Sequence, residues 1–279
     1  MDARKITRLL RSIQHRIRMW SAERAIRQVR HKAQKAHGLP GDLVVTLTSY
    51  PARFATLHKT LRSLLSQTVR ADRTVLWIAE DDLSDVPDDV RQLKALGLEI
   101  CSCPDLRSYK KIIPALKLWP EAFIVTADDD LYYPPDWLET LVEGVVRGEK
   151  IIICRRAHLP LKNEDGFAPY EEWQWDFVAD GEIRGDLFPT TGAGVLYPPG
   201  SLPTETLDVD SFRRLCPTAD DVWMFWMGRI NGASYRQVGG GFPQVSWTGS
   251  QSATLASVNC DGGNDEQLRA VCQCFPVVD

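Results

Sequence analysis

Short apolar runs alternate with longer amphipathic segments along most of this chain. The apolar runs are rich in Val, Ile and Leu, which is typical of strands that are buried on both faces of a sheet. The segments between them carry apolar residues at helical spacing, as Leu57, Leu61 and Leu64 do. This order predicts an α/β fold with a mainly parallel sheet flanked by helices. The predicted strands are 43–48, 74–79, 98–101 and 123–127, and the predicted helices are 54–67, 88–96, 109–119 and 135–146.

A basic segment precedes this pattern. Residues 1–37 hold eleven Lys and Arg against two acids, a net charge of +9, which leaves −13 for the rest of the chain. Apolar residues recur there at spacings of three and four, which predicts an amphipathic helix with a cationic opposite face. These apolar residues are Ile6, Leu10, Ile13, Ile17 and Trp20.

This basic arm has several candidate partners. We expect it to lie on an anionic membrane surface. One alternative is that it docks on a protein partner or on a second copy of the chain, and another is that it packs on its own domain. No nucleic acid is expected as a partner, because the arm lacks interleaved aromatic residues and the body is acidic. The Gly-Leu-Pro-Gly sequence at 38–41 breaks the helix, so the predicted domain covers 42–279, in two halves of about 42–150 and 151–279.

Composition limits the number of domains and the cellular location that can be expected. With 279 residues and 44% hydrophobic content, the chain can form one large domain or two small ones. It has no apolar stretch long enough to cross a bilayer and no secretory signal, so a cytoplasmic location is expected, peripheral at the cytosolic membrane face if the arm binds lipid. Seven cysteines, an odd number, indicate reduced thiols. The pairs Cys101/Cys103 and Cys272/Cys274 lack a zinc spacing and are expected to be inert.

Three consecutive acids follow the apolar run 123–127. Asp128, Asp129 and Asp130 repel one another, so a fold that gathers them at the end of a strand usually provides a cation. Side chains alternate along a strand, so Asp128 and Asp130 are expected to share a face. Hard oxygen ligands of this kind suit Mg²⁺ or Mn²⁺. The alternative is a solvated acidic turn.

Polar residues end the other predicted strands as well. Thr48, Tyr50 and Arg53 follow the first strand, and Glu80 and Asp81 follow the second. Ligands of parallel α/β sheets gather beyond the carboxyl ends of the strands, where these segments and the acids would meet. This shared edge favours a metal site over a bare surface turn.

The second half of the chain is rich in Trp, Gly and Pro. Trp173 and Trp175, the segment 190–200 and the glycines at 239–241 are typical of loops that hold a sugar, although most Trp residues are core residues. Asp220 and Asp221 open an apolar segment that reads as a helix, with Thr218 as its candidate N-cap. This pair is either a carboxylate at a pocket wall or a stabiliser of the helix dipole.

Together these residues resemble the nucleotide-sugar-dependent glycosyltransferases of the GT-A fold, a Rossmann-like architecture, and in particular bacterial inverting enzymes. The resemblance covers the chain from residue 42 onward and rests on four features in order. They are a first strand ending in Thr-Ser-Tyr-Pro-x-Arg, acids closing the second strand, an Asp-x-Asp motif after an apolar strand, and an acidic pair opening a late helix.

The resemblance implies a role for each of these segments. A divalent cation, Mn²⁺ or Mg²⁺, would be held by Asp130 and Asp128 and would bridge the diphosphate of the donor. Lys110 or Lys111 would add positive charge to the phosphates, although a solvated helix face is the alternative. The residues implied in binding the nucleotide sugar are Thr48, Tyr50, Arg53, Glu80, Asp81, Lys110, Lys111, Asp128, Asp129, Gly192 and Gly194.

Catalysis is implied for the late acidic pair. Asp221, or else Asp220, would accept the proton of the attacking hydroxyl. Many relatives complete the metal shell with a histidine near the C-terminus, but the last histidine here is His158, which is expected to be structural. The diphosphate and water would complete the shell instead. The segment 262–267 is predicted as an acceptor-side loop or an exposed turn.

The predicted function is metal-dependent transfer of a sugar from a nucleotide-sugar donor to a cell-surface glycan or lipid-linked acceptor, with inversion. A nucleotidyltransferase is one alternative, but it would normally show a glycine-rich basic loop after the first strand, and residues 48–53 contain no glycine. A glycoside hydrolase also uses paired acids. A non-catalytic module that binds a glycan or a nucleotide is the alternative outside the enzymes.

Overall fold

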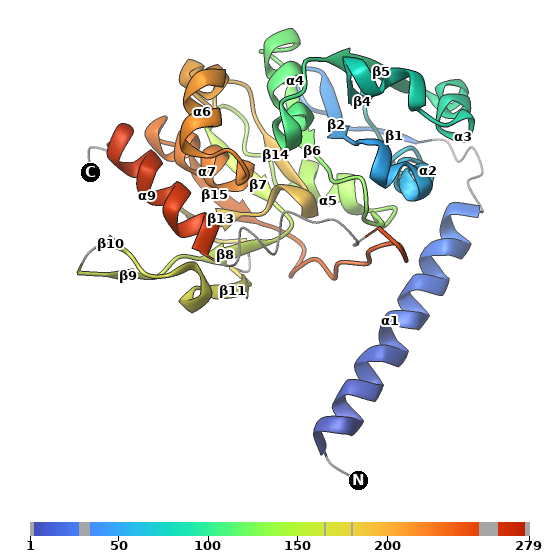
Figure 1. Cartoon of the computed structure of the whole chain (residues 1–279), viewed down its shortest axis with the longest axis horizontal. Coiled ribbons are helices and arrows are strands. Elements are labelled where there is room, and N and C mark those ends of the chain that lie inside the picture. The colour runs from blue at the N-terminus through green and yellow to red at the C-terminus, as the bar shows by residue number, and fades with distance from the viewer. Residues whose placement is uncertain (1–2, 28–33, 165, 180, 251–261, 277–279) are drawn as a thin grey trace.

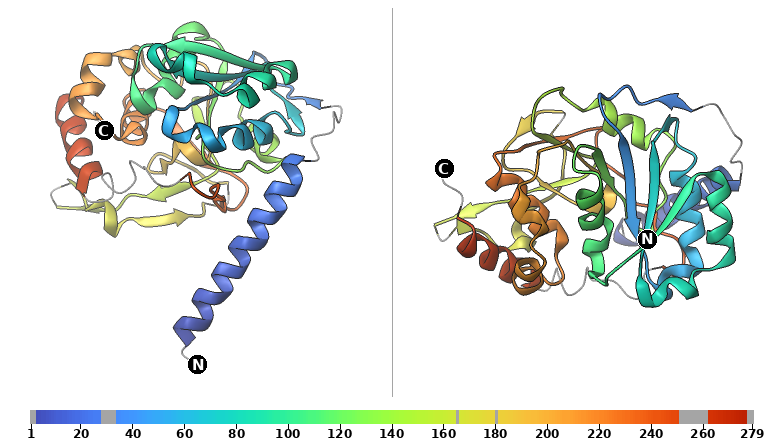
Figure 2. Two further views of the ribbon diagram at one scale, coloured as in Figure 1. Left: turned by 45° about the vertical axis from the view of Figure 1, so that its right-hand side comes forward. Right: turned by 90° about the horizontal axis from the view of Figure 1, so that it is seen from above.

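A computed structural model describes residues 3–27, 34–164, 166–179, 181–250 and 262–276, with side chains from residue 14 onward. Its centre is an eight-stranded sheet in the order β12-β15-β7-β14-β6-β2-β4-β5, with helices on both faces (Figure 1). The two further views in Figure 2 show the same layers. The strands are β2 (Leu43–Thr48), β4 (Arg73–Ala79), β5 (Leu98–Cys103), β6 (Phe123–Thr126), β7 (Ile151–Cys154), β12 (Ile183–Arg184), β14 (Val195–Tyr197) and β15 (Ser234–Gln237).

The sheet is mainly parallel, as predicted. β2 pairs in parallel with β4 and β6, β4 with β5, and β7 with β15. β14 is antiparallel to both of its neighbours, β6 and β7, so β6 and β7 run the same way. β12 is also antiparallel to its neighbour, β15. Of these two strands, β14 matters for the site because it returns the chain to the end of β6.

Two hydrophobic cores lie on opposite faces of the sheet. Alternate residues of one strand enter different cores, as Val44 and Val45 of β2 do, and both are fully buried. This burial on both faces explains the uninterrupted apolar runs in the sequence. The helices of one face are α2 (Phe54–Leu64), α3 (Asp88–Arg91) and α5 (Trp137–Glu143), and those of the other are α4 (Ile113–Leu118), α6 (Val209–Leu215), α7 (Asp220–Ile230) and α9 (Asn264–Cys274).

Several predicted boundaries were wrong. The predicted helix 109–119 divides into a 3₁₀ turn, Arg107–Lys111, and α4, in which Pro114 occupies the first turn. The predicted helix 88–96 is α3 followed by a 3₁₀ turn, Gln92–Leu96. Proline at a helix start has no backbone N–H to donate, so it begins a new helix more readily than it continues one.

Two predictions in the C-terminal part were also wrong. Most of the segment 262–267 is neither a loop nor an exposed turn, because α9 begins at Asn264, which is buried. Thr218 is not the N-cap of α7, since Ala219 occupies that position. The Thr218 backbone N–H donates to Gln267 Oε1 at 3.0 Å, so Gln267 ties the start of α7 to α9.

Three smaller sheets accompany the central one, two of them in the second half of the chain and one in the first half. β8 (Ala157–Leu159) pairs with β11 (Gln174–Phe177) and β13 (Phe188–Pro189), both antiparallel. β9 (Lys162–Asn163) pairs with β10 (Gly166–Phe167), and β1 (Lys35–Ala36) with β3 (Val69–Arg70). Of the tryptophans predicted on sugar-holding loops, Trp173 is a buried core residue and Trp175 is exposed.

The N-terminal helix α1 (Ala3–Arg27) projects from the body (Figure 1). Its last turns pack on the domain, where Ala22 and Ile26 contact Val245 and Trp247. Ile17 and Trp20, two residues of the predicted stripe, stay 59% and 63% exposed. The side chains of Ile6, Leu10 and Ile13 lie outside the described residues, as do residues 28–33 of the predicted arm. Over the residues that are described, no helix is both long and apolar enough to span a bilayer.

Candidate active site

The ends of β2 and β6 meet at one edge of the sheet, as predicted for parallel neighbours. Ser49, which follows β2, donates a hydrogen bond of 2.5 Å from its hydroxyl to Asp129 Oδ2. Arg53 Nη1 lies 2.5 Å from Asp130 Oδ2 and 3.8 Å from Asp129 Oδ1. The two sequence motifs therefore form one cluster of side chains, in which Ser49, a member of the first motif, has a contact that the sequence had not assigned to it.

The three acids of this cluster differ in environment. Asp129 is buried, and this burial raises its pKa to about 7 although the bond from Ser49 opposes the shift. Asp130 is also buried and is paired with Arg53. The side chain of Asp128 is 39% exposed. Asp128 is thus the acid most open to a ligand, while Asp129 is held inside the fold.

Lys111 joins the acids of β6 to those of α7. Its Nζ lies 2.8 Å from Asp128 Oδ1 and 3.0 Å from Asp220 Oδ2. Burial alone would lower the pKa of Lys111, but the carboxylates of Asp128, Asp220 and Asp221 raise it well above its usual range. The amine therefore keeps its charge, and it connects two acidic motifs that lie far apart in the sequence.

Asp221 is held by the loop that precedes β14. The backbone N–H and the hydroxyl of Thr191 both donate to Asp221 Oδ1, at 2.9 Å and 2.6 Å. Burial and then the charge of Asp220 raise the pKa of Asp221 to about 6, against the opposing effects of Lys111 and Thr191. A carboxylate that titrates just below neutral pH can accept a proton at pH 7 and return it afterwards.

The glycines of this loop are required by close packing. A Cβ on Gly192 would lie 2.1 Å from Asp128 Oδ2, and one on Gly194 would lie 2.5 Å from the Trp137 indole nitrogen. Trp137 donates to the Ala193 carbonyl at 2.8 Å. The loop thus sits directly against Asp128, next to the predicted donor site.

Tyr133 fixes the relation between the loop and the acids. Its hydroxyl donates to the Gly192 carbonyl at 2.6 Å and accepts from the Asp128 backbone N–H at 2.7 Å. The patterns used above gave no role to Tyr133 or Trp137. Their position directly after the acids, on either side of Pro134 and Pro135, is the one sequence signal that could have indicated them.

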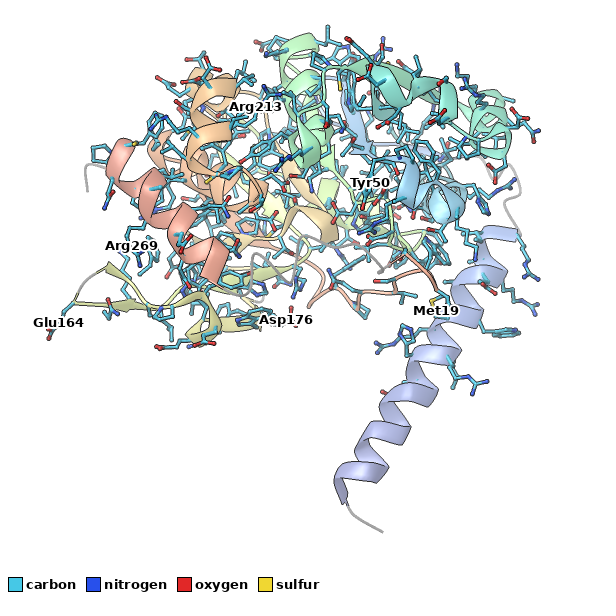
Figure 3. All side chains as sticks on the ribbon, viewed as in Figure 1. Met19, Tyr50, Glu164, Asp176, Arg213 and Arg269 are labelled. Atoms are coloured by element: carbon cyan, nitrogen blue, oxygen red, sulfur yellow. The ribbon has the colours of Figure 1, made fainter. Side chains whose placement is uncertain are left out.

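Other predicted donor residues lie at the same edge with different neighbours. Lys110 is buried and forms an ion pair with Asp105, not with Asp128. The Thr48 hydroxyl donates to the Trp77 carbonyl at 2.8 Å. Glu80 and Asp81 are exposed in a 3₁₀ turn that ends β4. Tyr50 is 38% exposed (Figure 3). Their roles in donor binding stay predictions.

The donor set suits a divalent cation that a substrate helps to bind. Among the described residues, no three His, Cys, Asp or Glu side chains are gathered as a metal site. Mg²⁺ and Mn²⁺ are commonly held by one or two carboxylates together with phosphates and water, so Asp128 and Asp130 fit this requirement. Each of these two carboxylates has a cationic partner, Lys111 or Arg53. Both carboxylates are therefore stabilised by a neighbouring positive charge, which a divalent cation would also supply.

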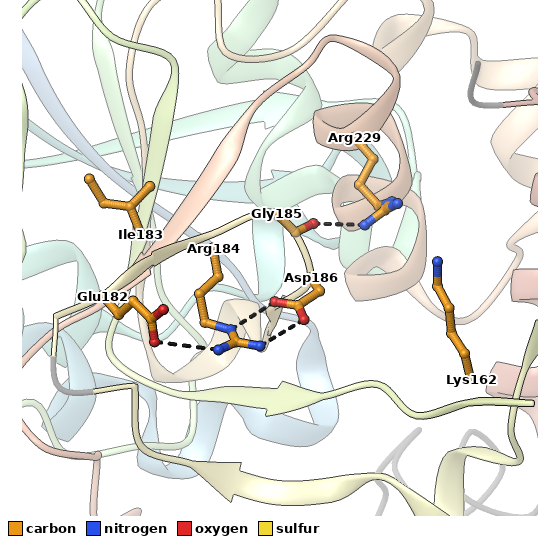
Figure 4. Close-up of a pocket in the computed structure, with 7 residues that line it drawn as sticks. All are labelled: Lys162, Glu182, Ile183, Arg184, Gly185, Asp186 and Arg229. Carbon is orange, nitrogen blue, oxygen red and sulfur yellow. Dashed lines mark hydrogen bonds and ion pairs between the residues drawn. The ribbon is translucent and has the colours of Figure 1, made fainter. Parts of the chain in front are cut away.

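A hollow of about 500 Å³ lies away from this cluster, between β12 and the end of α7 (Figure 4). Arg184 there is bonded to Asp186 at 2.8 Å, and Arg229 donates to the Gly185 carbonyl at 2.7 Å. Arg184 is thus neutralised by the acids beside it, and none of the seven lining residues belongs to the acidic cluster. Its volume alone does not make it the reaction site.

Comparison with known protein families gives one match. The family model described as glycosyl transferase family 2 matches residues 45–194, more than half of the chain. The matched region contains most of β2, the three acids and the loop 191–194, and it ends before Asp220 and Asp221. No curated protein matches the chain.

Solved structures show only a distant likeness. Glucosyl-3-phosphoglycerate synthase from Mycobacterium tuberculosis in complex with Mn²⁺, UDP and phosphoglyceric acid is 14% identical, with a TM-score of 0.49, over 89% of this chain and 86% of that one. The 4-diphosphocytidyl-2C-methyl-D-erythritol synthase from Anaerococcus prevotii is 11% identical, with a TM-score of 0.44, over 82% of this chain and 96% of that one. At TM-scores below 0.5 the likeness carries no argument about chemistry.

Proposed function

Since the chain belongs to glycosyl transferase family 2, we propose that it moves a sugar from a nucleotide-sugar donor to an acceptor hydroxyl, with a divalent cation and with inversion. The observation that carries the proposal is the bridge made by Lys111, because it brings the donor-side acid Asp128 and the acidic pair of α7 into one cluster. A single displacement needs a donor site and a base within one substrate length of each other.

Donor binding is assigned to the edge beyond β2 and β6. A Mn²⁺ or Mg²⁺ ion held by Asp130 and Asp128 would stabilise the negative charge of the departing nucleoside diphosphate. Arg53 and Lys111 form ion pairs with the two carboxylates. Each would become available to phosphate oxygens once a divalent cation replaces it as the partner of its carboxylate. Gly192 leaves the space that Asp128 needs.

Proton transfer is assigned to Asp221. Thr191 orients its carboxylate through two hydrogen bonds, and the raised pKa, about 6, makes it a competent base at neutral pH. Asp220 instead forms an ion pair with Lys111 Nζ at 3.0 Å. Inversion would require this base to activate the acceptor on the sugar face opposite to the leaving group, and Asp221 is separate from the donor-side acids, as that requires.

The test is release of nucleoside diphosphate from a panel of nucleotide sugars, with and without Mn²⁺. We expect release that depends on the metal, and Asp130→Asn should weaken Mn²⁺-supported binding of the nucleoside diphosphate about tenfold or more. Glu99→Gln, a carboxylate on β5 away from the cluster, is the matched control. Release of pyrophosphate would indicate nucleotidyl transfer instead. Absence of both turnover and metal-dependent nucleotide binding would refute the proposal.

We also propose that helix α1 brings the enzyme to an anionic membrane, where a cell-surface glycan or lipid-linked acceptor would be extended. Ile17 and Trp20 project from the helix among its cationic residues, and neither is used in packing on the domain. Replacing both by Ser should release the protein from anionic vesicles and preserve nucleotide binding. Leu118→Ser, which changes an equally exposed apolar residue on α4, is the control. Unchanged co-sedimentation of the double variant would contradict this role.

A further inference from the structure

A second cavity, of about 320 Å³, lies beside the candidate active site. β8, β11 and the loop after β15 form its walls. Its volume is at the lower end of the range for small-molecule sites, about 300 to 1,000 Å³. The residues that line it are Arg156, Ala157, Asp176, Phe177, Val178, Gln237, Gly240, Gly241, Phe242 and Pro243.

Two short connections link this cavity to the reacting groups. The first lies directly after β13: the Thr190 backbone N–H donates to the Arg156 carbonyl at 3.1 Å, and the next residue, Thr191, donates to Asp221. The second runs through Phe242, which stacks on Tyr133 with ring centroids 5.9 Å apart. Tyr133 in turn bonds the backbone of Asp128. The cavity is therefore linked through a few intervening residues to both the base and the donor-side acids.

The wall formed by β11 has an irregular backbone. The register between β11 and β8 shifts between Gln174 and Phe177, and Asp176 adopts a φ of +53°, which is uncommon for a residue other than glycine. The buried imidazole of His158 supports this shape, because its Nδ1 accepts a bond of 3.0 Å from the Asp176 backbone N–H. Burial lowers the pKa of His158 to about 4, so the ring stays neutral and remains an acceptor. Bulges of this kind re-aim side chains beside functional sites.

The charges of the cavity cancel. Of its ten lining residues, Arg156 and Asp176 are the charged ones, and Arg156 Nε donates to Asp176 Oδ1. A site for a phosphate or carboxylate would need a cation that is not already neutralised. A neighbouring guanidinium and carboxylate offer donors and acceptors to hydroxyl groups instead. Phe177, Val178 and Pro243 add an apolar wall suited to the C–H faces of a sugar ring.

We infer that this cavity binds a neutral, hydroxyl-bearing saccharide unit of the acceptor, and the inference rests on the glycosyltransferase function proposed above. Arg156 and Asp176 bond the hydroxyl groups, and the apolar wall covers the ring. Gly241, with a φ of +108° and no atom near its Cβ position, leaves its backbone open toward the cavity. Acceptors whose terminal unit carries a phosphate are excluded by the Asp176 carboxylate.

The experiment measures binding of methyl glycosides of common hexoses, and of the matching hexose 6-phosphates, by NMR titration of the full chain. We expect the neutral glycosides to bind and the phosphates to bind at least about tenfold more weakly. Val178→Trp should fill the cavity from a position that is 43% exposed, and weaken glycoside binding about tenfold or more. Ile183→Trp, at a position 47% exposed on β12 and outside the cavity, is the matched control.

Asp176→Asn tests the charge argument directly. Asn tolerates the same backbone conformation, so the wall keeps its shape while Arg156 loses its neutralising partner. We expect this variant to bind hexose 6-phosphates about tenfold more tightly than the wild type does. The inference is overturned if the wild type prefers the phosphates, if none of the neutral glycosides binds, or if Val178→Trp and Ile183→Trp have the same effect.

A parallel titration with UDP, GDP and CDP in the presence of Mn²⁺ separates this inference from the proposed function. Glycoside binding without any nucleotide binding would refute the proposed function and support the assignment of the cavity. Nucleotide binding without glycoside binding would do the reverse.

Discussion

The hydroxyl of Thr191 should set the pH at which the enzyme loses activity in acid. It donates a hydrogen bond of 2.6 Å to Asp221 Oδ1 and so favours the ionised carboxylate. Thr191→Val removes this bond, keeps the side-chain shape and leaves the backbone donor at 2.9 Å in place. If Asp221 is the base, the acid limb of the pH–rate profile, where activity falls as the pH is lowered, must then move to higher pH.

The expected shift follows from the strength of one hydrogen bond to a charged group, about 1.5 to 3 kcal/mol. One pKa unit corresponds to about 1.4 kcal/mol, so losing this hydrogen bond should raise the pKa of Asp221 by about one to two units. Water that enters the space would replace part of the bond, which favours the lower value. The pKa of Asp221 would rise from about 6 to about 7. At pH 6 the ionised fraction then falls from about half to about a tenth, a fivefold loss of rate, whereas at pH 8 the loss is about a tenth.

The assay is metal-dependent release of nucleoside diphosphate between pH 5 and pH 9. Thr206→Val is the matched control, because that buried hydroxyl has no hydrogen-bond partner in the part of the chain that the structure describes. It should leave the acid limb in place. A Thr191→Val enzyme with an unmoved limb, or with the same loss at every pH, would refute the assignment of Asp221.

Three further predictions concern the same cluster. Asp221→Asn should lower turnover about 100- to 10,000-fold and leave calorimetric binding of the nucleoside diphosphate with Mn²⁺ unchanged; a variant with more than about a tenth of the wild-type rate would speak against the base. Gly192→Ala should abolish donor binding in a protein that still folds by circular dichroism, because the new methyl group would lie 2.1 Å from Asp128 Oδ2. Gly185→Ala, which meets no atom within 4 Å, should have no effect, and equal behaviour of the two would contradict the steric argument. Lys111→Met should lower the free energy of unfolding in urea at pH 7.5 by about 3 kcal/mol, the low end for a broken buried pair because Asp128 is partly exposed. The deficit should shrink as the pH falls and the carboxylates become protonated; a constant deficit would show that charge is not the cause.

The sheet and the three acids could be predicted from the sequence. The predicted strand 43–48 coincides with β2, because its residues are buried on both faces and leave an uninterrupted apolar run. The same pattern predicted that the segments after β2 and β6 share one edge, since parallel neighbours end at the same side, but not the specific contact of Arg53 with Asp130. The break before α4 was missed because the apolar spacing continues across the 3₁₀ turn and the helix, and Pro114 is the sequence feature that marks it.

The sequence by itself thus determined the fold class and the composition of the acidic edge. Tertiary structure alone decided which of two adjacent lysines is used: Lys111 turns toward Asp128 and Asp220, and Lys110 toward Asp105. It also decided that Thr191 meets Asp221 and that Tyr133 meets Gly192. These contacts depend on the position of the antiparallel β14 between β6 and β7. Strand order is set by how whole elements pack against one another, and the local spacing of apolar residues does not reveal it.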